Sequence, residues 1–533
     1  MDSPQIGLEA SPANPNLHDD GSSGLARKLK HTSNYIQENP KFIPTNVILG
    51  NGDVIVEYVV PGTAPHVPRA NTVHRWQISS DDLRANSPYF RALLDPSKFY
   101  EGRKFMQQKS ARPVTTITSG DVATQPNNGA ISDMTLHSLP IIRLPVDLFP
   151  LEFGPDAIEL FLKVLCFKSF DDEEKETFNA EMKLKPTSLI ARLIELADAF
   201  NSPHVIHQAM TRSGYNFGKG KVSLLKFDTS ILRQSEDRIR QTIFIARFLN
   251  RCDVFQITTH ALIIHGSKFW TNGVEMPSPL IFHWRYLPDG LEEELYYRRQ
   301  CILSTITDLQ ASFLRVYGAL EFDEDMKQPT TSQATTTVPT RQYQCRCGFG
   351  NASACDAFHL GQMTRFFALR TKTIFLGSTL IDPDFGSDIE DDSDSSNEDQ
   401  CHYNAGSSTP AAPPKDITSI ISSLKQFPDY QIDQNHTGCG VRRRFLPPLD
   451  CIERFIGDSR ALVGVDLQAW DTKLWRRASG SWANRSLRRA LIINVHFSKI
   501  NAVPALTSGR QFPDPQEENA RLLFTAKQRN WES

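Results

Sequence analysis

The stretch HRWQISSDDLRANSPYFRALLDPSKFYEG, residues 74–102, decides the predicted fold because its hydrophobic period changes from that of a strand to that of a helix. Trp76 and Ile78 alternate with polar neighbours, which is typical of a half-buried strand. Ser79 or Ser80 is then a suitable N-cap for a helix whose first turn carries two aspartates. We therefore expect a short strand followed directly by a helix.

A second helix is predicted directly after the first, which should end near Asn86. Ser87 precedes a proline, and Ser-Pro is a typical helix start with the serine as cap. Phe90, Leu93 and Leu94 lie at i, i+3 and i+4 and form one apolar face. Neither helix carries an obvious catalytic group.

The segments around this stretch predict an α+β domain over residues 45–210. Alternating apolar residues predict a strand within 46–60, and IIRLPVDLFP (141–150) predicts another. Three segments with helical periodicity complete the domain. The polar segment 106–138 is predicted to be a surface insertion.

The rest of the chain is predicted to be mostly helical, with polar segments between the helical ones. The run at 382–400 contains nine Asp and Glu residues and no Lys or Arg, which predicts disorder. The predicted parts are a flexible arm (1–44), a helical domain (211–325), a linker (326–342), a cysteine-containing segment (343–380), an acidic and Ser-rich disordered loop (381–415) and a C-terminal region (416–533).

The order of elements in residues 45–210 resembles that of the BTB/POZ domain, a small mixed sheet with helices. In the opening stretch the matching residues are Leu83, Ser87, Phe90, Phe99 and Glu101. Further partial matches are Asp53-Val54 in the first strand and the later run Ala197, Asp198 and Phe200. The segment CDAFHLGQMTRFF (355–367) is similar to one found behind the BTB module in large fungal proteins.

The resemblance implies a protein–protein interaction adaptor or scaffold. It implies homodimerisation through the first strand and first helix, and recruitment of substrates to a cullin-type ubiquitin ligase. The family's cullin contact uses an apolar-X-Glu element, which Phe99-Tyr100-Glu101 would supply. On this reading Leu83→Asp or Phe90→Ala should abolish partner binding. The expected partner-binding residues are Leu83, Ser87, Tyr89, Phe90, Leu94, Phe99, Tyr100 and Glu101.

Cysteine and histidine are concentrated in CRCGFGNASACDAFHLG and NHTGCG, which also contain His359. Zinc prefers four nitrogen or sulfur ligands in a tetrahedron, so these segments predict a structural zinc site. Reduced cysteines are also common as small buried apolar residues, and that alternative stays open. The candidate ligands are Cys345, Cys347, Cys355, His436 and Cys439.

Basic residues interleaved with tryptophan suggest a second function, that of a nuclear transcriptional regulator with a nucleic-acid-binding C-terminal tail. A formal net charge of −3 argues against a chain built mainly to coat nucleic acid. The same arginines would equally dock on the acidic run or form a solvated helix face. They are Arg442–Arg444, Arg476, Arg477, Arg485, Arg488 and Arg489, with Trp475 and Trp482 among them.

The composition of the chain narrows the class of protein to which it can belong. Hydrophobic residues make up 40% and charged residues 22% of the 533 residues, which is typical of a globular chain. Nine scattered cysteines are too few for a disulfide framework. No apolar run reaches the roughly 20 residues of a membrane helix. The first twenty residues contain no apolar core of a signal peptide. We therefore expect the protein in the nucleus or cytoplasm. No hydrolase, metalloprotease or dinucleotide motif is present, which predicts a protein that is not an enzyme.

Overall fold

The computed structural model describes the chain from residue 44 onward, with gaps. The described residues are 44–60, 72–110, 139–144, 153–218, 224–270, 274, 283–318, 343–345, 347, 350–373, 416–468, 515–526, 529 and 531. Residues 1–43 of the predicted arm, the linker 326–342, the acidic loop 381–415 and Arg476–Arg489 all lie outside these ranges.

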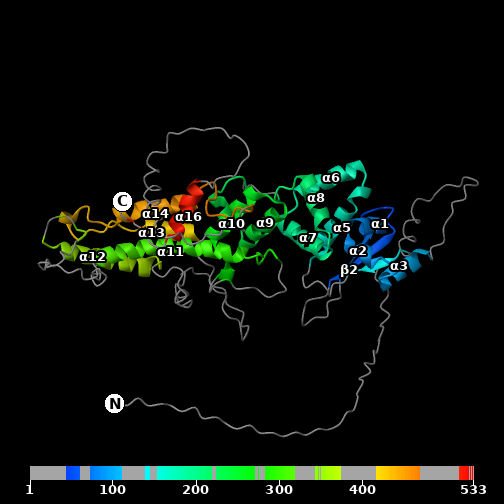
Figure 1. The fold of residues 1–533 in the computed structure, drawn as a ribbon, viewed down its shortest axis with the longest axis horizontal. Coiled ribbons are helices and arrows are strands. Elements are labelled where there is room, and N and C mark those ends of the chain that lie inside the picture. Colours follow the sequence, from blue (N-terminus) through cyan, green and yellow to red (C-terminus); the bar gives the residue numbers. More distant parts are fainter. Residues whose placement is uncertain are drawn as a thin grey trace, which may run out of the picture. The chain divides into compact units, whose positions relative to one another are not determined.

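The α+β class is confirmed: a four-stranded mixed sheet is followed by a mostly helical remainder (Figure 1). The strand order is β1-β3-β2-β4, in which β2 pairs antiparallel with β3 and parallel with β4, and β1 pairs parallel with β3. The register places Val54 opposite Ile78 and Val56 opposite Trp76, and all four side chains are buried. The strands are β1 (Thr45–Val47), β2 (Val54–Val60), β3 (Thr72–Ile78) and β4 (Ile141–Arg143).

Both predicted helix starts in the opening stretch are confirmed. The Ser79 hydroxyl accepts a hydrogen bond from the Asp82 amide at 3.2 Å, and the Ser87 hydroxyl accepts one from the Phe90 amide at 3.4 Å. These bonds satisfy amides that helix starts leave without a partner. The helices of this part are α1 (Ser80–Asn86), α2 (Pro88–Leu93), α3 (Tyr100–Ser110), α5 (Pro155–Leu165), α6 (Asp172–Lys183), α7 (Thr187–Ala199) and α8 (Pro203–Ser213).

The predicted insertion at 106–138 is wrong at its first residues, because α3 continues to Ser110. Phe105 is buried, and the Lys109 ammonium lies 2.7 Å from the Asp53 carboxylate. These two contacts hold polar residues in a helix that the sequence pattern assigned to a loop. Residues 111–138 lie outside the described part of the chain.

The helical remainder is assembled along α11, a helix of 28 residues (Figure 1). Its apolar stripe faces the core: Leu295, Ile302, Ile306 and Leu309 are fully buried. Helices α10, α12, α14 and α16 contact α11, and α13 contacts α10 and α14. The helices are α9 (Glu236–Phe248), α10 (Cys252–His265), α11 (Leu291–Gly318), α12 (Ala352–Arg365), α13 (Ile417–Lys425), α14 (Arg442–Ile456) and α16 (Pro515–Thr525).

A buried ion pair joins α9 to α11. The Arg240 guanidinium donates to both carboxylate oxygens of Glu292, at 2.7 and 2.8 Å, and neither side chain is exposed. Ser267, Glu236 and the Arg285 carbonyl accept further hydrogen bonds from this guanidinium. A buried charge pair persists only when its hydrogen-bonding capacity is filled in this way.

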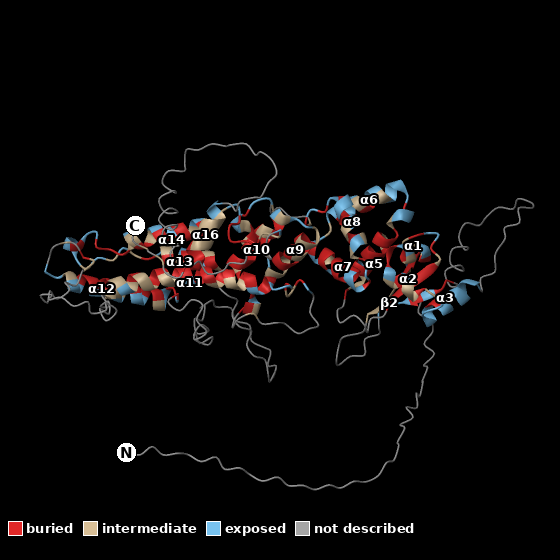
Figure 2. Ribbon diagram, viewed as in Figure 1, coloured by how far each residue is buried: buried red, intermediate tan, exposed pale blue. Residues whose placement is uncertain are grey.

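Buried apolar side chains form one cluster from Leu49, before β2, to Phe524 in α16, and Figure 2 shows how burial is distributed over the helices. Helix α7 packs on α9, so the core continues past the predicted boundary at residue 210. Among the helices that the structure describes, none combines the length and apolar character that crossing a bilayer requires.

Candidate interaction surface and candidate metal centre

Four of the eight expected partner-binding residues are core residues, which corrects the sequence prediction. Leu83, Ser87, Phe90 and Leu94 have no exposed surface. The apolar face of α1 and α2 is covered by helices of the same chain, so no partner can reach these side chains in the folded protein.

Contacts with α5 and α7 explain this burial. The Phe90 ring stacks on Phe200, with centroids 5.3 Å apart, and Phe161 stacks on the same ring at 5.2 Å. The Ser87 hydroxyl donates to the Phe200 carbonyl at 3.0 Å, and the Asn86 amide donates to the Leu165 carbonyl at 2.6 Å. These residues therefore join α1 and α2 to the rest of the module.

Of the other expected residues, Phe99, Tyr100 and Glu101 lie at the start of α3, and Tyr89 lies in α2. Phe99 is 45% exposed and Tyr100 is 65% exposed, while Met106 farther along the helix is 40% exposed. Glu101 is exposed, and Tyr89 is half-buried. Burial raises the pKa of Tyr89, and the negative charge of Glu101 raises it further. We call Tyr89, Phe99, Tyr100, Glu101 and Met106 the α3 surface.

The opposite side of α3 is held by three contacts. A Cβ atom on Gly102 would lie 2.6 Å from the backbone of Asp95, so only glycine permits this approach. Phe105 fills the core, and Lys109 pairs with Asp53. Burial opposes ionisation of Asp53, but hydrogen bonds from Lys109 and Ser80 outweigh it and lower the pKa of that carboxyl. The exposed aromatic residues thus sit on a fixed helix.

The outer face of α1 offers little apolar surface for the expected homodimer. Its exposed residues are Asp81 and Ala85, and the Asp82 carboxylate accepts a hydrogen bond from Ser169 at 2.6 Å. In the edge strand β1, Val47 is 55% exposed.

Three of the five candidate zinc ligands converge, and a fourth, Cys347, approaches one of them. The sulfur atoms of Cys345, Cys355 and Cys439 all lie within 4.8 Å of one another, and all three side chains are buried. The Cys347 sulfur lies 3.1 Å from that of Cys439, which in turn lies 3.5 Å from that of Cys345. We call these four residues the thiol cluster. All four are free cysteines.

The fifth candidate, His436, lies outside the thiol cluster because both of its ring nitrogens are engaged elsewhere. Its Nδ1 is 2.8 Å from an Asp433 carboxylate oxygen, and its Nε2 is 3.0 Å from the Asn351 side-chain oxygen. The histidine therefore links the turn before Cys439 to the residue preceding α12. It is a positioning residue, not one of the converging donors.

Asp356 positions the other side of the thiol cluster. Its buried carboxylate accepts hydrogen bonds from the amides of Gln344 and Cys345, at 2.8 and 3.1 Å. Asp356 follows Cys355 in α12. The same turn of α12 therefore carries the candidate ligand Cys355 and holds the loop that contains Cys345. Burial first, and the neighbouring thiols second, raise the pKa of the Cys355 thiol.

Among the described residues, neither ring nitrogen of buried His359 has a hydrogen-bond partner. It lies one turn after Cys355, with its ring 5.8 Å from that of Tyr317. Burial lowers the pKa of His359, so the imidazole is favoured in its neutral form.

Two arginines of the predicted basic patch have structural partners. Arg442 donates to the carbonyls of Lys425 and Phe427, and Arg444 donates to the Gln344 side chain at 2.8 Å. Of Arg442, Arg443 and Arg444, only Arg443 is exposed. The nucleic-acid prediction therefore has little support from Arg442–Arg444, and its remaining arginines lie outside the described residues.

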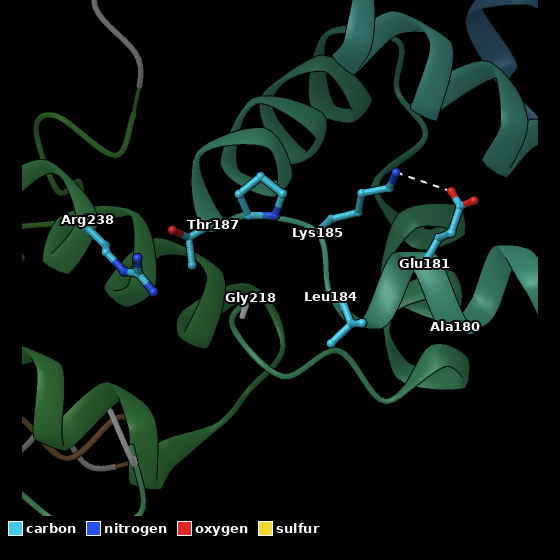
Figure 3. A pocket seen from close by; sticks show the side chains of 8 residues that line it. Ala180, Glu181, Leu184, Lys185, Thr187, Gly218 and Arg238 are labelled. Carbon is cyan, nitrogen blue, oxygen red and sulfur yellow. Dashed lines mark hydrogen bonds and ion pairs between the residues drawn. The ribbon is translucent and has the colours of Figure 1, made fainter. Parts of the chain in front are cut away.

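A cavity of about 600 Å³ lies beside the end of α6 (Figure 3). Lys185 and Glu181 form an ion pair across 3.3 Å at its rim. The described residues that line it include no cysteine, serine or histidine. They are Ala180, Glu181, Leu184, Lys185, Pro186, Thr187, Gly218 and Arg238.

No protein-family model, no curated protein and no solved structure matches the chain.

Several positioning residues were missed by the sequence analysis. Asp356 beside Cys355 is a carboxylate next to a candidate ligand, which is a signal that could have been used. For Asn351 and Gly102 the sequence contains no comparable signal, because their roles depend on segments distant in the chain or on one close backbone contact.

Proposed function

We propose that residues 45–210 form a BTB/POZ-type interaction module and that the protein is an adaptor for a cullin-type ubiquitin ligase scaffold. The order of elements supports the module: an antiparallel pair β2–β3, helices α1 and α2, strand β4 parallel to β2, and then α5, α7 and α8. The proposal places the partner at the α3 surface and not at α1 and α2.

The observation that carries the proposal is the exposure of Phe99 and Tyr100 on an anchored helix. Aromatic residues are enriched where proteins bind each other, because they bury a large area at a small entropic cost. Glu101 beside them adds a charge that would select a basic partner group. Gly102 and Phe105 hold the helix in place before binding, which lowers the cost of association.

The test is titration of the full chain with the N-terminal domain of a cullin, followed by calorimetry. Tyr100→Ala and Glu101→Lys should each weaken binding by about tenfold or more, the effect of a hot-spot residue. Leu225→Ala is the matched control, because Leu225 is 73% exposed outside the α3 surface and should leave binding unchanged. A wild-type chain that binds no cullin, or equal losses in Leu225→Ala, would contradict the proposal.

Self-association is the second part of the proposal, and it places the contact at β1. The solution mass of the full chain by light scattering tests it, with Val47→Arg as the disrupting variant. A dimer that Val47→Arg separates supports this arrangement, whereas a monomeric wild type removes it.

A further inference from the structure

We infer that Cys345, Cys347, Cys355 and Cys439 bind one structural Zn²⁺ ion through four thiolates. The assignment keeps the four cysteines of the predicted ligand set and removes His436 from it. It does not depend on the proposed adaptor function, because it uses residues of the helical remainder alone.

The sulfur positions fit a tetrahedral zinc centre. Zinc–thiolate bonds of about 2.3 Å in a tetrahedron place neighbouring sulfur atoms about 3.8 Å apart. The sulfur atoms of Cys345, Cys355 and Cys439 lie within 4.8 Å of one another, with those of Cys345 and Cys439 3.5 Å apart. The Cys347 sulfur lies 3.1 Å from that of Cys439 but outside this group of three, so Cys347 must move to complete the tetrahedron. A disulfide requires about 2.05 Å, so no pair here is bonded.

The ligand chemistry selects the metal. Four soft sulfur donors with tetrahedral spacing favour Zn²⁺ over Mg²⁺ or Ca²⁺, which take oxygen ligands. Binding releases the four thiol protons to solvent and leaves a centre with a net charge of −2. Arg444 lies beside this centre, with its guanidinium 2.8 Å from the side chain of Gln344, and partly offsets that charge.

Hydrogen bonds around the thiol cluster hold the segments that carry the ligands. Asp356 accepts from the amide of Cys345, and His436 joins the Cys439 turn to Asn351. The Cys439 amide donates to the His436 carbonyl at 3.2 Å, which closes that turn. Residues that orient ligands in this way are a regular part of metal sites.

The zinc ion would join three segments: the loop before α12, α12 itself and the turn before α14. The chain between Cys355 and Cys439 contains the acidic run 382–400, so the metal closes a covalent loop around it. A cross-link of this kind reduces the conformational freedom of the unfolded chain. The free energy of metal binding also contributes to the free energy of folding.

The first measurement is the metal content of the full chain, purified without chelator, by mass spectrometry. We expect one zinc ion per chain in the wild type and a loss of zinc in Cys347→Ser and Cys439→Ser. Cys252→Ser is the matched control, because Cys252 is a partly exposed thiol on α10 outside the cluster and should retain zinc. His359→Phe should also retain zinc, which separates this histidine from the ligands.

Cobalt substitution keeps the inference testable if a buried-cysteine variant fails to fold. The chelator-treated wild-type chain should take up one Co²⁺ and develop the absorption bands of a tetrahedral four-thiolate site. The inference is overturned by a wild-type chain without metal that takes up no cobalt, by bound iron in place of zinc, or by a Cys347–Cys439 disulfide in the intact mass.

Discussion

The α3 surface and the thiol cluster differ in what holds their side chains. The α3 surface comes mainly from one continuous stretch, and its aromatic residues are exposed while Phe105 and Lys109 anchor the helix. The thiol cluster comes from three segments, with Cys345 and Cys439 separated by 94 positions. Its members are mostly buried and contact one another.

Because of this difference, substitutions in the α3 surface should affect partner binding, and substitutions in the thiol cluster should affect the stability of the fold. Removing an exposed side chain changes few contacts within the folded chain, so its effect should appear in partner binding. Removing a buried ligand should change folding, because structural metal binding contributes directly to the free energy of folding. Five measurements test this separation, from the largest expected effect on stability to the smallest.

Zinc removal should have the largest effect. Chelation of the full chain, or Cys355→Ser, should lower the stability of α12 and the 433–441 turn by several kcal/mol, because structural zinc binding is folding free energy. Hydrogen exchange followed by mass spectrometry measures it, with protection lost in α12 and retained in α5 and α7. Equal protection with and without chelator would place the stability of α12 in side-chain packing alone.

Leu83→Ala should destabilise the N-terminal module by about 2–5 kcal/mol, the usual cost of truncating a fully buried leucine. Urea unfolding monitored by circular dichroism checks this value. The folded fraction of the variant should still bind the partner, since Leu83 has no exposed surface. A specific loss of binding with unchanged stability would restore Leu83 to the interface.

Acid should destabilise the helical remainder through His260. This buried imidazole accepts from the Val463 amide and donates to the Ile456 carbonyl, and burial lowers its pKa from 6.5 to about 4. The folded state therefore binds fewer protons than the unfolded state between these values. Stability is full above pH 6.5 and falls as the pH drops towards 4, by about 3 kcal/mol in total.

Urea unfolding at a series of pH values measures the His260 effect. The Cys347→Ser background removes the contribution of thiolate protonation at the zinc site, and Asp458 is the nearby carboxylate that acts on the histidine. His260→Gln should flatten the slope between pH 6.5 and 4. An unchanged slope in that variant would assign the acid sensitivity to another group.

Gly102→Ala should have an intermediate effect, because it moves the α3 surface without removing any of its side chains. The added methyl group would meet the backbone of Asp95 and Leu94, which cannot rotate away. We expect a loss of about 1–3 kcal/mol in stability, typical of overpacking, together with weaker partner binding. Lys104→Ala, an exposed position in the same helix, is the control and should change neither quantity.

Tyr100→Ala should have the smallest effect on stability, within about 0.5 kcal/mol, because its side chain is 65% exposed. The melting temperature of the full chain measures it. A large drop would mean that Tyr100 supports the fold, and a loss of binding in this variant would then no longer locate the interface.

Short-range features of the fold were predictable from the sequence. The caps at Ser79 and Ser87 and the apolar stripe of α11 follow from hydrogen-bonding capacity and helical period, which involve residues within a few positions of each other. The concentration of cysteines also pointed to a metal site before any geometry was known. The continuation of α3 to Ser110 was not predictable, because it depends on contacts with Asp53 and the core.

The sequence by itself determined which residues share a face and which segments carry sulfur ligands. Only the tertiary structure decided that Phe90 faces Phe200 of the same chain and not a partner, and that Cys347 and not His436 approaches the other thiols. The physical reason is that periodicity describes one helix at a time. What covers an apolar face, and which donors converge on one point, depends on how segments far apart in the chain pack together.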